Sequence, residues 1–262
     1  MEARAYDRSP FIAELYDYIA TLAARPDIDF YVNAAREYGG PVLELGCGTG
    51  RILIPTARAG IEVSGVDASE QMLAACRRRL DDEAPEVRGR TTLYAGDMRA
   101  LDLRRRYRLI TLPFRLFQYL LTVEEQLACL AAVDRHLEAS GWLILDVAEP
   151  SIQNLASPLD TAETDEQPFR HPDGRTIIRH HRLLERDLCS QTFSTELAFD
   201  VTYLDGRTER FAHQHRFRYL FRFEAEHLLA RAGFIVSNVF SDFDRSPYGA
   251  KYPGTLIFIA RR

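Results

Sequence analysis

Apolar and polar residues follow one another with two different periods along the chain, and the change of period divides it into a core and an insertion. Short apolar runs bounded by turn residues predict seven core strands, at 42–46, 61–66, 91–95, 107–113, 142–148, 234–240 and 255–260. Apolar positions at helical spacing predict helices between them, at 50–59, 69–80, 123–139 and 222–232. Strands separated by helices predict parallel crossovers and an open α/β sheet.

The period changes to two between residues 175 and 220. Apolar and aromatic residues occupy alternate positions of one run, at Phe193, Thr195, Leu197, Phe199, Val201 and Tyr203. The next run repeats the pattern at Phe211, His213, His215, Phe217 and Tyr219. Turn signals at Asp173-Gly174 and Asp205-Gly206 separate these runs, so we expect an antiparallel meander of about three strands after the fifth core strand.

We therefore expect three parts. Residues 1–150 hold an N-terminal helical lid and a core, 151–221 form an inserted antiparallel β cap, and 222–262 complete the core. The stretch 150–172, rich in proline, serine and acids, predicts a loop or lid. Two more helices are expected near the N-terminus, at 9–24 and 27–38.

Cap residues mark the helix at 123–139 most clearly. Thr122 and Glu125 have the spacing of a capping box at its start. Ser140-Gly141 is expected to end the helix before the next strand begins.

A glycine-rich loop follows the first core strand. Gly46, Gly48 and Gly50 stand at every second position, with Glu44 before them, and the second strand leads into Asp67. A tight glycine turn lets a ligand lie against the backbone, and an acid at the next strand end can accept from two ribose hydroxyls. The pair predicts a nucleoside site; a packing turn between strand and helix is the alternative.

The glycine spacing separates this loop from dinucleotide sites, which read Gly-x-Gly-x-x-Gly. Here the third glycine comes one residue earlier, and the chain resembles class I S-adenosylmethionine-dependent methyltransferases, in particular the glycine N-methyltransferase and sugar N-methyltransferase subgroup. The resemblance implies a doubly wound, seven-stranded, mostly parallel Rossmann-like sheet with an inserted antiparallel β-sheet. It also implies S-adenosyl-L-methionine as cofactor and S-adenosyl-L-homocysteine as product.

The same resemblance assigns cofactor contacts to residues around the strand ends. Asp67 is expected at the ribose, and Asp97 at the adenine amine. N-terminal aromatics are expected to close over the cofactor, with Arg36 as a candidate for its carboxylate; helix packing is the alternative for these residues. The full set is Tyr16, Tyr31, Glu44, Gly46, Gly48, Gly50, Asp67, Ala68, Met72, Asp97, Met98 and Pro113.

The segment 113–119 is expected to border the transferred methyl group. Methyltransferases of nucleic-acid bases carry Asp/Asn-Pro-Pro-Tyr/Phe here, whereas this chain has Leu112 before a single proline, which argues against base methylation. Alignment with sugar N-methyltransferases places Tyr119 where their catalytic histidine lies. A tyrosine there could orient an amine or accept a proton, and packing at the sheet edge is the alternative.

Two histidines of the insertion, His213 and His215, are further candidates for a catalytic base. Arginines gather in the same region, and they predict either a solvated sheet face or a floor that attracts an anionic or hydroxyl-rich substrate. The histidines lack acidic or cysteine neighbours at ligand spacing, so no metal site is expected.

Composition narrows the functional classes. A net charge of −5 over 262 residues gives no support for broad binding of nucleic acid or membranes. The four cysteines are scattered, and no signal peptide or membrane span is apparent, so we expect a cytoplasmic protein with reduced thiols.

Our leading hypothesis is methylation of an amine or hydroxyl of a small molecule, with specialised metabolism as one setting. A protein or RNA methyltransferase, or a non-catalytic protein that binds the cofactor, are the alternatives. In the subgroup the inserted sheet roofs the substrate site or forms the subunit contact, so a homodimer through this sheet is one expectation.

Overall fold

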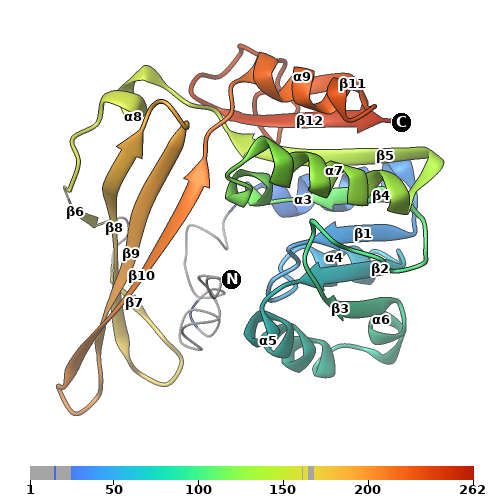
Figure 1. The fold of residues 1–262 in the computed structure, drawn as a ribbon. Helices are drawn as coiled ribbons and strands as arrows, with labels where there is room; N and C mark the ends of the chain where they lie inside the picture. The colour runs from blue at the N-terminus through green and yellow to red at the C-terminus, as the bar shows by residue number, and fades with distance from the viewer. Residues whose placement is uncertain (1–14, 16–24, 161, 165–167) are drawn as a thin grey trace.

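The computed structural model describes residues 15, 25–160, 162–164 and 168–262. One sheet contains seven strands: β1 (Val42–Leu45), β2 (Val63–Asp67), β3 (Thr91–Ala95), β4 (Tyr107–Leu112), β5 (Leu137–Ala148), β11 (Ile235–Phe240) and β12 (Thr255–Arg261). Their order is β11-β12-β5-β4-β1-β2-β3, and β12 alone runs against its neighbours (Figure 1). The predicted mostly parallel α/β sheet is confirmed.

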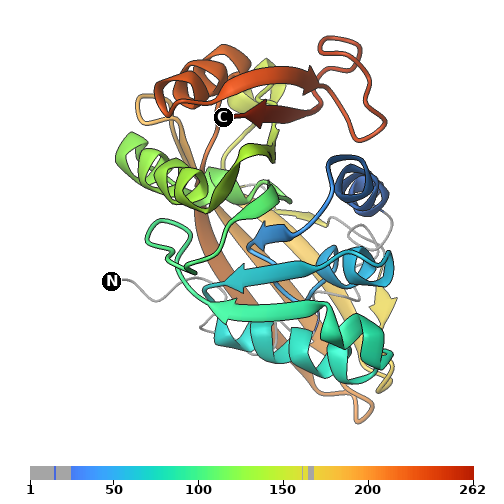
Figure 2. The same ribbon diagram turned by 90° about the vertical axis from the view of Figure 1, so that its right-hand side faces the viewer.

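Within the described residues, six helices accompany this sheet: α3 (Asp27–Tyr38), α4 (Leu53–Arg58), α5 (Glu70–Asp81), α6 (Pro85–Gly89), α7 (Val123–His136) and α9 (Arg222–Arg231). Helices α7 and α9 cover one face, and α3, α4 and α5 cover the other. In Figure 2 the green helix α7 and the blue helix α3 lie on opposite sides of the strands. Layers on both faces explain why the core strands read as continuous apolar runs.

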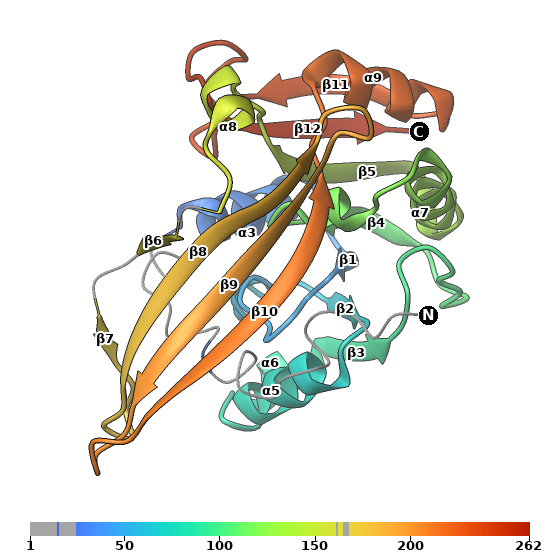
Figure 3. The ribbon, with the colours of Figure 1, turned by 60° about the vertical axis from the view of Figure 1, so that its left-hand side comes forward.

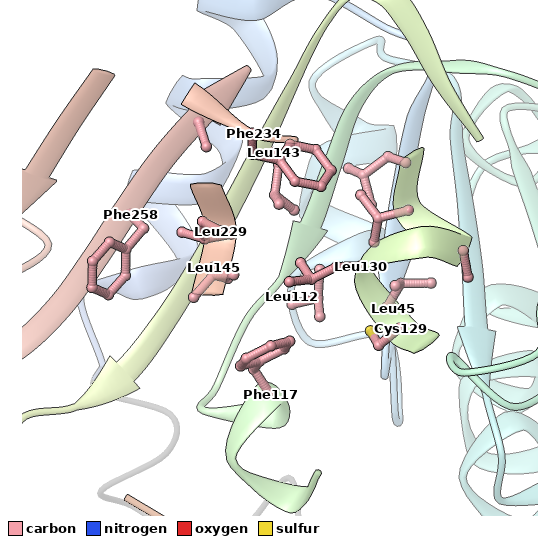
Figure 4. Close-up of a cluster of buried hydrophobic side chains, with 14 of the residues drawn as sticks. Leu45, Leu112, Phe117, Cys129, Leu130, Leu143, Leu145, Leu229, Phe234 and Phe258 are labelled. Atoms are coloured by element: carbon pink, nitrogen blue, oxygen red, sulfur yellow. The ribbon is translucent and has the colours of Figure 1, made fainter. Parts of the chain in front are cut away.

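Two buried clusters fill the spaces between the sheet and its helices. Neighbouring residues of a strand face opposite clusters: Leu143 and Leu145 pack toward α7, while Ile144 packs toward α3. Figure 4 shows the cluster on the α7 side, where Leu130 of α7 lies beside Leu112 of β4. The alternation fixes the register of each strand, since a slip of one residue would exchange its two faces.

The helix predicted at 123–139 ends three residues early, so this boundary is wrong. Thr122 caps its start by accepting from the Glu125 amide at 3.2 Å, as expected. At the other end Leu137 is extended and fully buried, and it pairs with Tyr107 of β4. Burial and strand pairing of Leu137 therefore extend β5 and override the predicted stop at Ser140-Gly141.

The insertion contains a second sheet of five strands: β6 (Ala162–Thr164), β7 (Phe169–Arg170), β8 (Thr176–Asp187), β9 (Thr192–Thr202) and β10 (Thr208–Arg218). The three long strands form the predicted meander, and β6 and β7 add two short pairings to β8. The predicted turns are confirmed, because Gly174 and Gly206 have φ angles of 93° and 84°. A short helix, α8 (Ile152–Ala156), lies where only a loop or lid was expected.

The second sheet lies across the edge where the parallel strands end (Figure 3). We call its inner face the side on which Leu197 and Phe199 lie, because this side packs with Phe114 from the segment after β4. Strand pairing places His181, Leu197 and His213 in one row of this face and Thr195 and His215 in the next.

A 3-10 helix, η3 (Leu116–Tyr119), joins the two sheets. The buried Gln118 donates to the Arg218 carbonyl of β10 at 3.0 Å and accepts from the Ala148 amide of β5 at 2.8 Å. One side chain therefore ties η3 to both sheets.

Three further expectations concern the N-terminal helix, membrane spans and metal sites. The predicted helix at 9–24, with Tyr16, lies outside the described residues apart from Leu15. Across the described ranges, none of the helices has the length and apolar character needed to cross a membrane. Within those same ranges, no group of three or more His, Cys, Asp or Glu residues could hold a metal ion.

Candidate active site

The glycine loop after β1 is shaped by positive backbone angles. Gly46, Gly48 and Gly50 have φ angles of 65°, 54° and 85°, which side chains on L-residues rarely allow. A Cβ at Gly46 would lie 2.7 Å from the Leu116 side chain, whereas a Cβ at Gly48 would meet nothing within 4 Å. The loop is therefore tightly packed at Gly46 and leaves open space at Gly48.

Asp67 connects this loop to the end of β2. Its carboxylate accepts from the Gly48 amide at 2.9 Å and from the Ser69 amide at 2.8 Å. Ser69 in turn caps α5 by accepting from the Met72 amide, and the half-buried Ala68 lies between the two polar residues. The carboxylate is thus held at the loop by backbone groups.

Glu44 lies buried in β1, with 3% of its surface exposed. Burial raises the pKa of this carboxyl to about 8, Arg51 opposes the rise, and the charges of Asp27 and Asp67 add to it. Near neutral pH, the Glu44 carboxyl is therefore in large part uncharged.

A charged cluster that the sequence analysis missed lies beside the loop. Arg51 donates to both oxygens of the buried Asp27, at 2.7 and 2.6 Å, and Arg25 donates to one of them at 3.1 Å. Although burial alone would raise the pKa of Asp27, the hydrogen bonds and charges of the two arginines lower it. Both guanidinium groups lie over the Phe114 ring, at 4.8 Å for Arg25 and 5.4 Å for Arg51.

One nitrogen of this cluster lacks a hydrogen-bond partner in the described residues. It is Arg25 Nη2, which is buried. By contrast, Arg36, the predicted partner of the cofactor carboxylate, is exposed on α3 and donates to Asn33 at 3.1 Å. The immediate sequence signal for the cluster was Arg51, which directly follows Gly50.

The segment after β4 adopts a strained turn held by a buried carboxylate. Phe114 and Arg115 both have φ angles of 60°, and their consecutive amides donate to Asp146 at 2.8 and 3.0 Å. Two such amides form a concave anion site, which the carboxylate fills. Tyr31 of α3 donates to the same carboxylate at 2.6 Å and is itself 1% exposed. Tyr31 thus lies in the core, and Pro113, which precedes the turn, is buried as well.

The predicted adenine side lies beyond β3. Asp97 forms an ion pair with Arg99, at 2.7 Å between Oδ2 and Nη2, and Arg99 also pairs with Glu125 of α7. Met98 is half-buried against the main core cluster, and Met72 is buried in α5. Asp97 was predicted from the sequence, whereas Arg99, which donates to both oxygens of that carboxylate, was not.

The predicted catalytic residues meet where η3 contacts the inserted sheet. The ring centroids of Tyr119 and His215 are 5.9 Å apart, and His213 stacks on His215 at 5.8 Å. His215 Nε2 lies 2.9 Å from the Thr195 hydroxyl. Burial lowers the pKa of His215 to about 4, with contributions from His213 and His181. Tyr119 of η3 and the two histidines of β10, which lie far from it in sequence, therefore form one cluster.

Most arginines of the insertion lie away from this cluster, in ion pairs. Arg182 pairs with Glu196 at 2.9 Å, and Arg210 pairs with Asp200 at 3.0 Å, on the face of the sheet opposite His213 and His215. We call this the outer face. Arg182 and Arg210 thus fit the solvated sheet face, whereas Arg179 and Arg186, opposite Phe199 and Phe193, lie on the inner face.

Known proteins match this chain in both sequence and fold. Residues 42–141 match a family model described as a methyltransferase domain. Over 253 residues the chain is 25% identical to the cypemycin N-terminal methyltransferase of a Streptomyces species, and 95% of each chain is covered. The CcbJ methyltransferase from Streptomyces caelestis superposes with a TM-score of 0.82 at 27% identity, covering 98% of this chain and 97% of that one.

A third relative was solved with the predicted cofactor bound. CalS10, an amino pentose methyltransferase from Micromonospora echinaspora, has a TM-score of 0.65 and 27% identity, covering 90% of this chain and 89% of that one. The open space at Gly48 and the unpartnered nitrogen of Arg25 fit such a ligand. The resemblance and the cofactor predicted from the glycine loop are confirmed. Residues 42–141 are a methyltransferase domain, and the chain is similar over most of its length to S-adenosylmethionine-dependent methyltransferases.

Proposed function

We propose that this enzyme methylates an amine of a small molecule, in specialised metabolism. The observation that carries the proposal is the cluster of Tyr119, Thr195 and His215 on the inner face, beside the turn at Phe114. Two of the relatives named above, an N-terminal methyltransferase and an amino pentose methyltransferase, support an amine as the acceptor. The absence of the Asn-Pro-Pro-Tyr pattern supports a small-molecule acceptor in preference to a nucleic-acid base.

The protonation of His215 supports an amine in preference to a hydroxyl. A hydroxyl must lose its proton to a base as it attacks, and such a base works best with a pKa near the operating pH. A pKa of about 4 makes His215 a weak base at neutral pH. An amine that arrives uncharged needs no base, only alignment with the methyl group, and alignment can be worth about 7–11 kcal/mol of barrier.

We assign the cofactor contacts as follows. S-adenosylmethionine supplies a methyl group on a positively charged sulfur. Asp67 accepts from the ribose hydroxyls, and Asp97, oriented by Arg99, accepts from the adenine amine. Arg25 Nη2 donates to the cofactor carboxylate, in place of the predicted Arg36.

Calorimetry with S-adenosylhomocysteine tests these contacts. Asp67→Ala is expected to weaken binding by about 100-fold, since it removes the acceptor for two ribose hydroxyls and frees the Gly48 amide. The matched control is Asp81→Ala, an exposed aspartate at the end of α5. Equal affinity in the two variants would remove Asp67 from the site.

A coupled assay for S-adenosylhomocysteine tests the acceptor. Small amines are expected to give product that mass spectrometry identifies as N-methylated, and the matching alcohols are expected to give none. Methylated alcohol would contradict the choice of amine, and tight cofactor binding with no turnover of any nucleophile would favour a binding protein. A homodimer through the inserted sheet stays a prediction, which light scattering can check.

A further inference from the structure

The ring of His215 is held in one orientation on the edge strand of the inserted sheet. It lies between His213, at 5.8 Å and an interplanar angle of 16°, and Phe217, at 6.0 Å and 30°. Because these neighbours stack along β10, the plane of the imidazole crosses the strand direction. Its two nitrogens therefore point across the sheet and not along it.

One nitrogen faces the neighbouring strand. His215 Nε2 lies 2.9 Å from the Thr195 hydroxyl of β9. The two ring nitrogens diverge, so Nδ1 points away from β9. Strand β10 is the last in the order β10-β9-β8-β6, and η3 of the core packs against it through Tyr119. Nδ1 therefore points toward the region where the inserted sheet meets η3 of the core.

The hydrogen-bond count decides where the proton of His215 lies. The Thr195 side chain is buried, with 1% of its surface exposed, and His215 Nε2 is its hydrogen-bond partner. If Thr195 donates, Nε2 accepts, and the ring proton lies on Nδ1. If Nε2 donates instead, the buried hydroxyl proton and Nδ1 both lack a partner, and buried polar groups rarely do. The first arrangement leaves one unsatisfied group, so it is the favoured one.

That remaining group is itself buried. His215 Nδ1 has no hydrogen-bond partner in the described ranges of the chain. An uncharged imidazole presents one donor and one acceptor, and here the acceptor is already used by Thr195. Nδ1–H is consequently a donor that requires an acceptor atom, and a bound molecule can supply one.

We propose that His215 donates its Nδ1 proton to an oxygen of the methyl acceptor, and so selects amines that carry a neighbouring hydroxyl, carbonyl or carboxylate oxygen. The proposal rests on the proposed function and gives His215 the role of a specificity residue in place of a base. Sites built to hydrogen-bond a polar group reject analogues that lack it, because the buried donor is then left unpaired.

Four variants separate a donor from a base. His215→Asn keeps an N–H near the position of Nδ1 but cannot accept a proton, whereas His215→Gln places its amide near Nε2. His215→Ala removes both nitrogens, and Thr195→Val removes the hydroxyl that sets the tautomer. His227→Asn, at an exposed histidine of α9, is the matched control.

Nuclear magnetic resonance of protein with nitrogen-15-labelled histidine reads the tautomer directly and needs no substrate. The resonances of His215 are assigned as those lost in His215→Asn and kept in His227→Asn. We expect the proton on Nδ1, and we expect Thr195→Val to shift the population toward Nε2. A proton on Nε2 in the unmodified enzyme would overturn the proposal.

Turnover of 2-aminocyclohexanol and cyclohexylamine tests the selection. The unmodified enzyme is expected to prefer the amino alcohol by about tenfold in kcat/KM, a preference that His215→Asn keeps and that His215→Ala and His215→Gln lose. An unchanged preference in His215→Ala, or equal turnover of both amines by the unmodified enzyme, would overturn the proposal while leaving N-methylation intact. Turnover of neither would count against N-methylation, and the tautomer measurement would still decide the role of His215.

Discussion

The two sides of the active site are built in different ways. On the cofactor side, backbone groups hold the key side chain: the Gly48 and Ser69 amides donate to Asp67, and these residues come from two successive β-turn-α units. On the acceptor side, side chains from η3, β9 and β10 meet through aromatic contacts and one hydrogen bond. The cofactor side depends on backbone geometry that the glycine spacing specifies. The acceptor side depends on individual side chains, so single substitutions can change which substrate it binds.

Asp146 lies between these two sides and is linked to both. Its carboxylate accepts from Tyr31 of α3 and from the Phe114 and Arg115 amides. The Phe114 ring then contacts the arginines of the cofactor side and the inner face of the inserted sheet. Substitution of Asp146 is therefore expected to lower the stability of the fold more than substitutions on either side.

The largest effect is expected from Asp146→Ala. The variant leaves three donors without an acceptor in a buried site, so the free energy of unfolding should fall by about 3–5 kcal/mol. Urea denaturation measures this fall. Tyr31→Phe removes one of the three donors and should cost about 1–3 kcal/mol. Equal losses in both variants would mean that the turn at Phe114 does not depend on the carboxylate.

A smaller, pH-dependent effect is expected at Glu44, on the cofactor side. Its folded pKa of about 8 lies above the unfolded value, so the folded state holds a proton that the unfolded chain releases. The contribution to stability is full at low pH and is lost as pH rises through about 8. Relative to Glu44→Gln, the enzyme should lose about 1–3 kcal/mol between pH 5 and pH 9.

Urea denaturation at several pH values measures this difference. Glu86→Gln, at an exposed glutamate of α6, is the control and should follow the unmodified enzyme at each pH. A pH dependence that is the same in Glu44→Gln and in the unmodified enzyme would show that Glu44 is charged throughout.

The smallest effect is expected on the outer face of the inserted sheet. Arg210 is about half exposed and pairs with Asp200 at 3.0 Å, and exposed pairs contribute little to stability. Arg210→Ala should change the free energy of unfolding by less than about 0.5 kcal/mol and leave kcat/KM unchanged. A tenfold loss of kcat/KM would instead show that arginines of the outer face take part in binding the substrate.

The sequence alone determined most elements of the core and the cofactor. Apolar runs located the core strands, because strands that are buried on both faces consist mainly of apolar residues. The spacing of Gly46, Gly48 and Gly50 identified the cofactor loop, since their positive φ angles depend on local backbone chemistry. Period-two alternation likewise indicated that His213 and His215 share a face of one strand.

Only the tertiary structure decided which of these elements meet. Tyr31 and Asp146 are 115 residues apart, and the docking of α3 against β5 brings them together. The contact between Tyr119 and His215 depends in the same way on how the inserted sheet packs against η3. A residue's period in the sequence specifies the face it occupies but not the element that covers that face. For that reason the glycine loop could be identified from the sequence, whereas the acceptor cluster required the packing of two sheets.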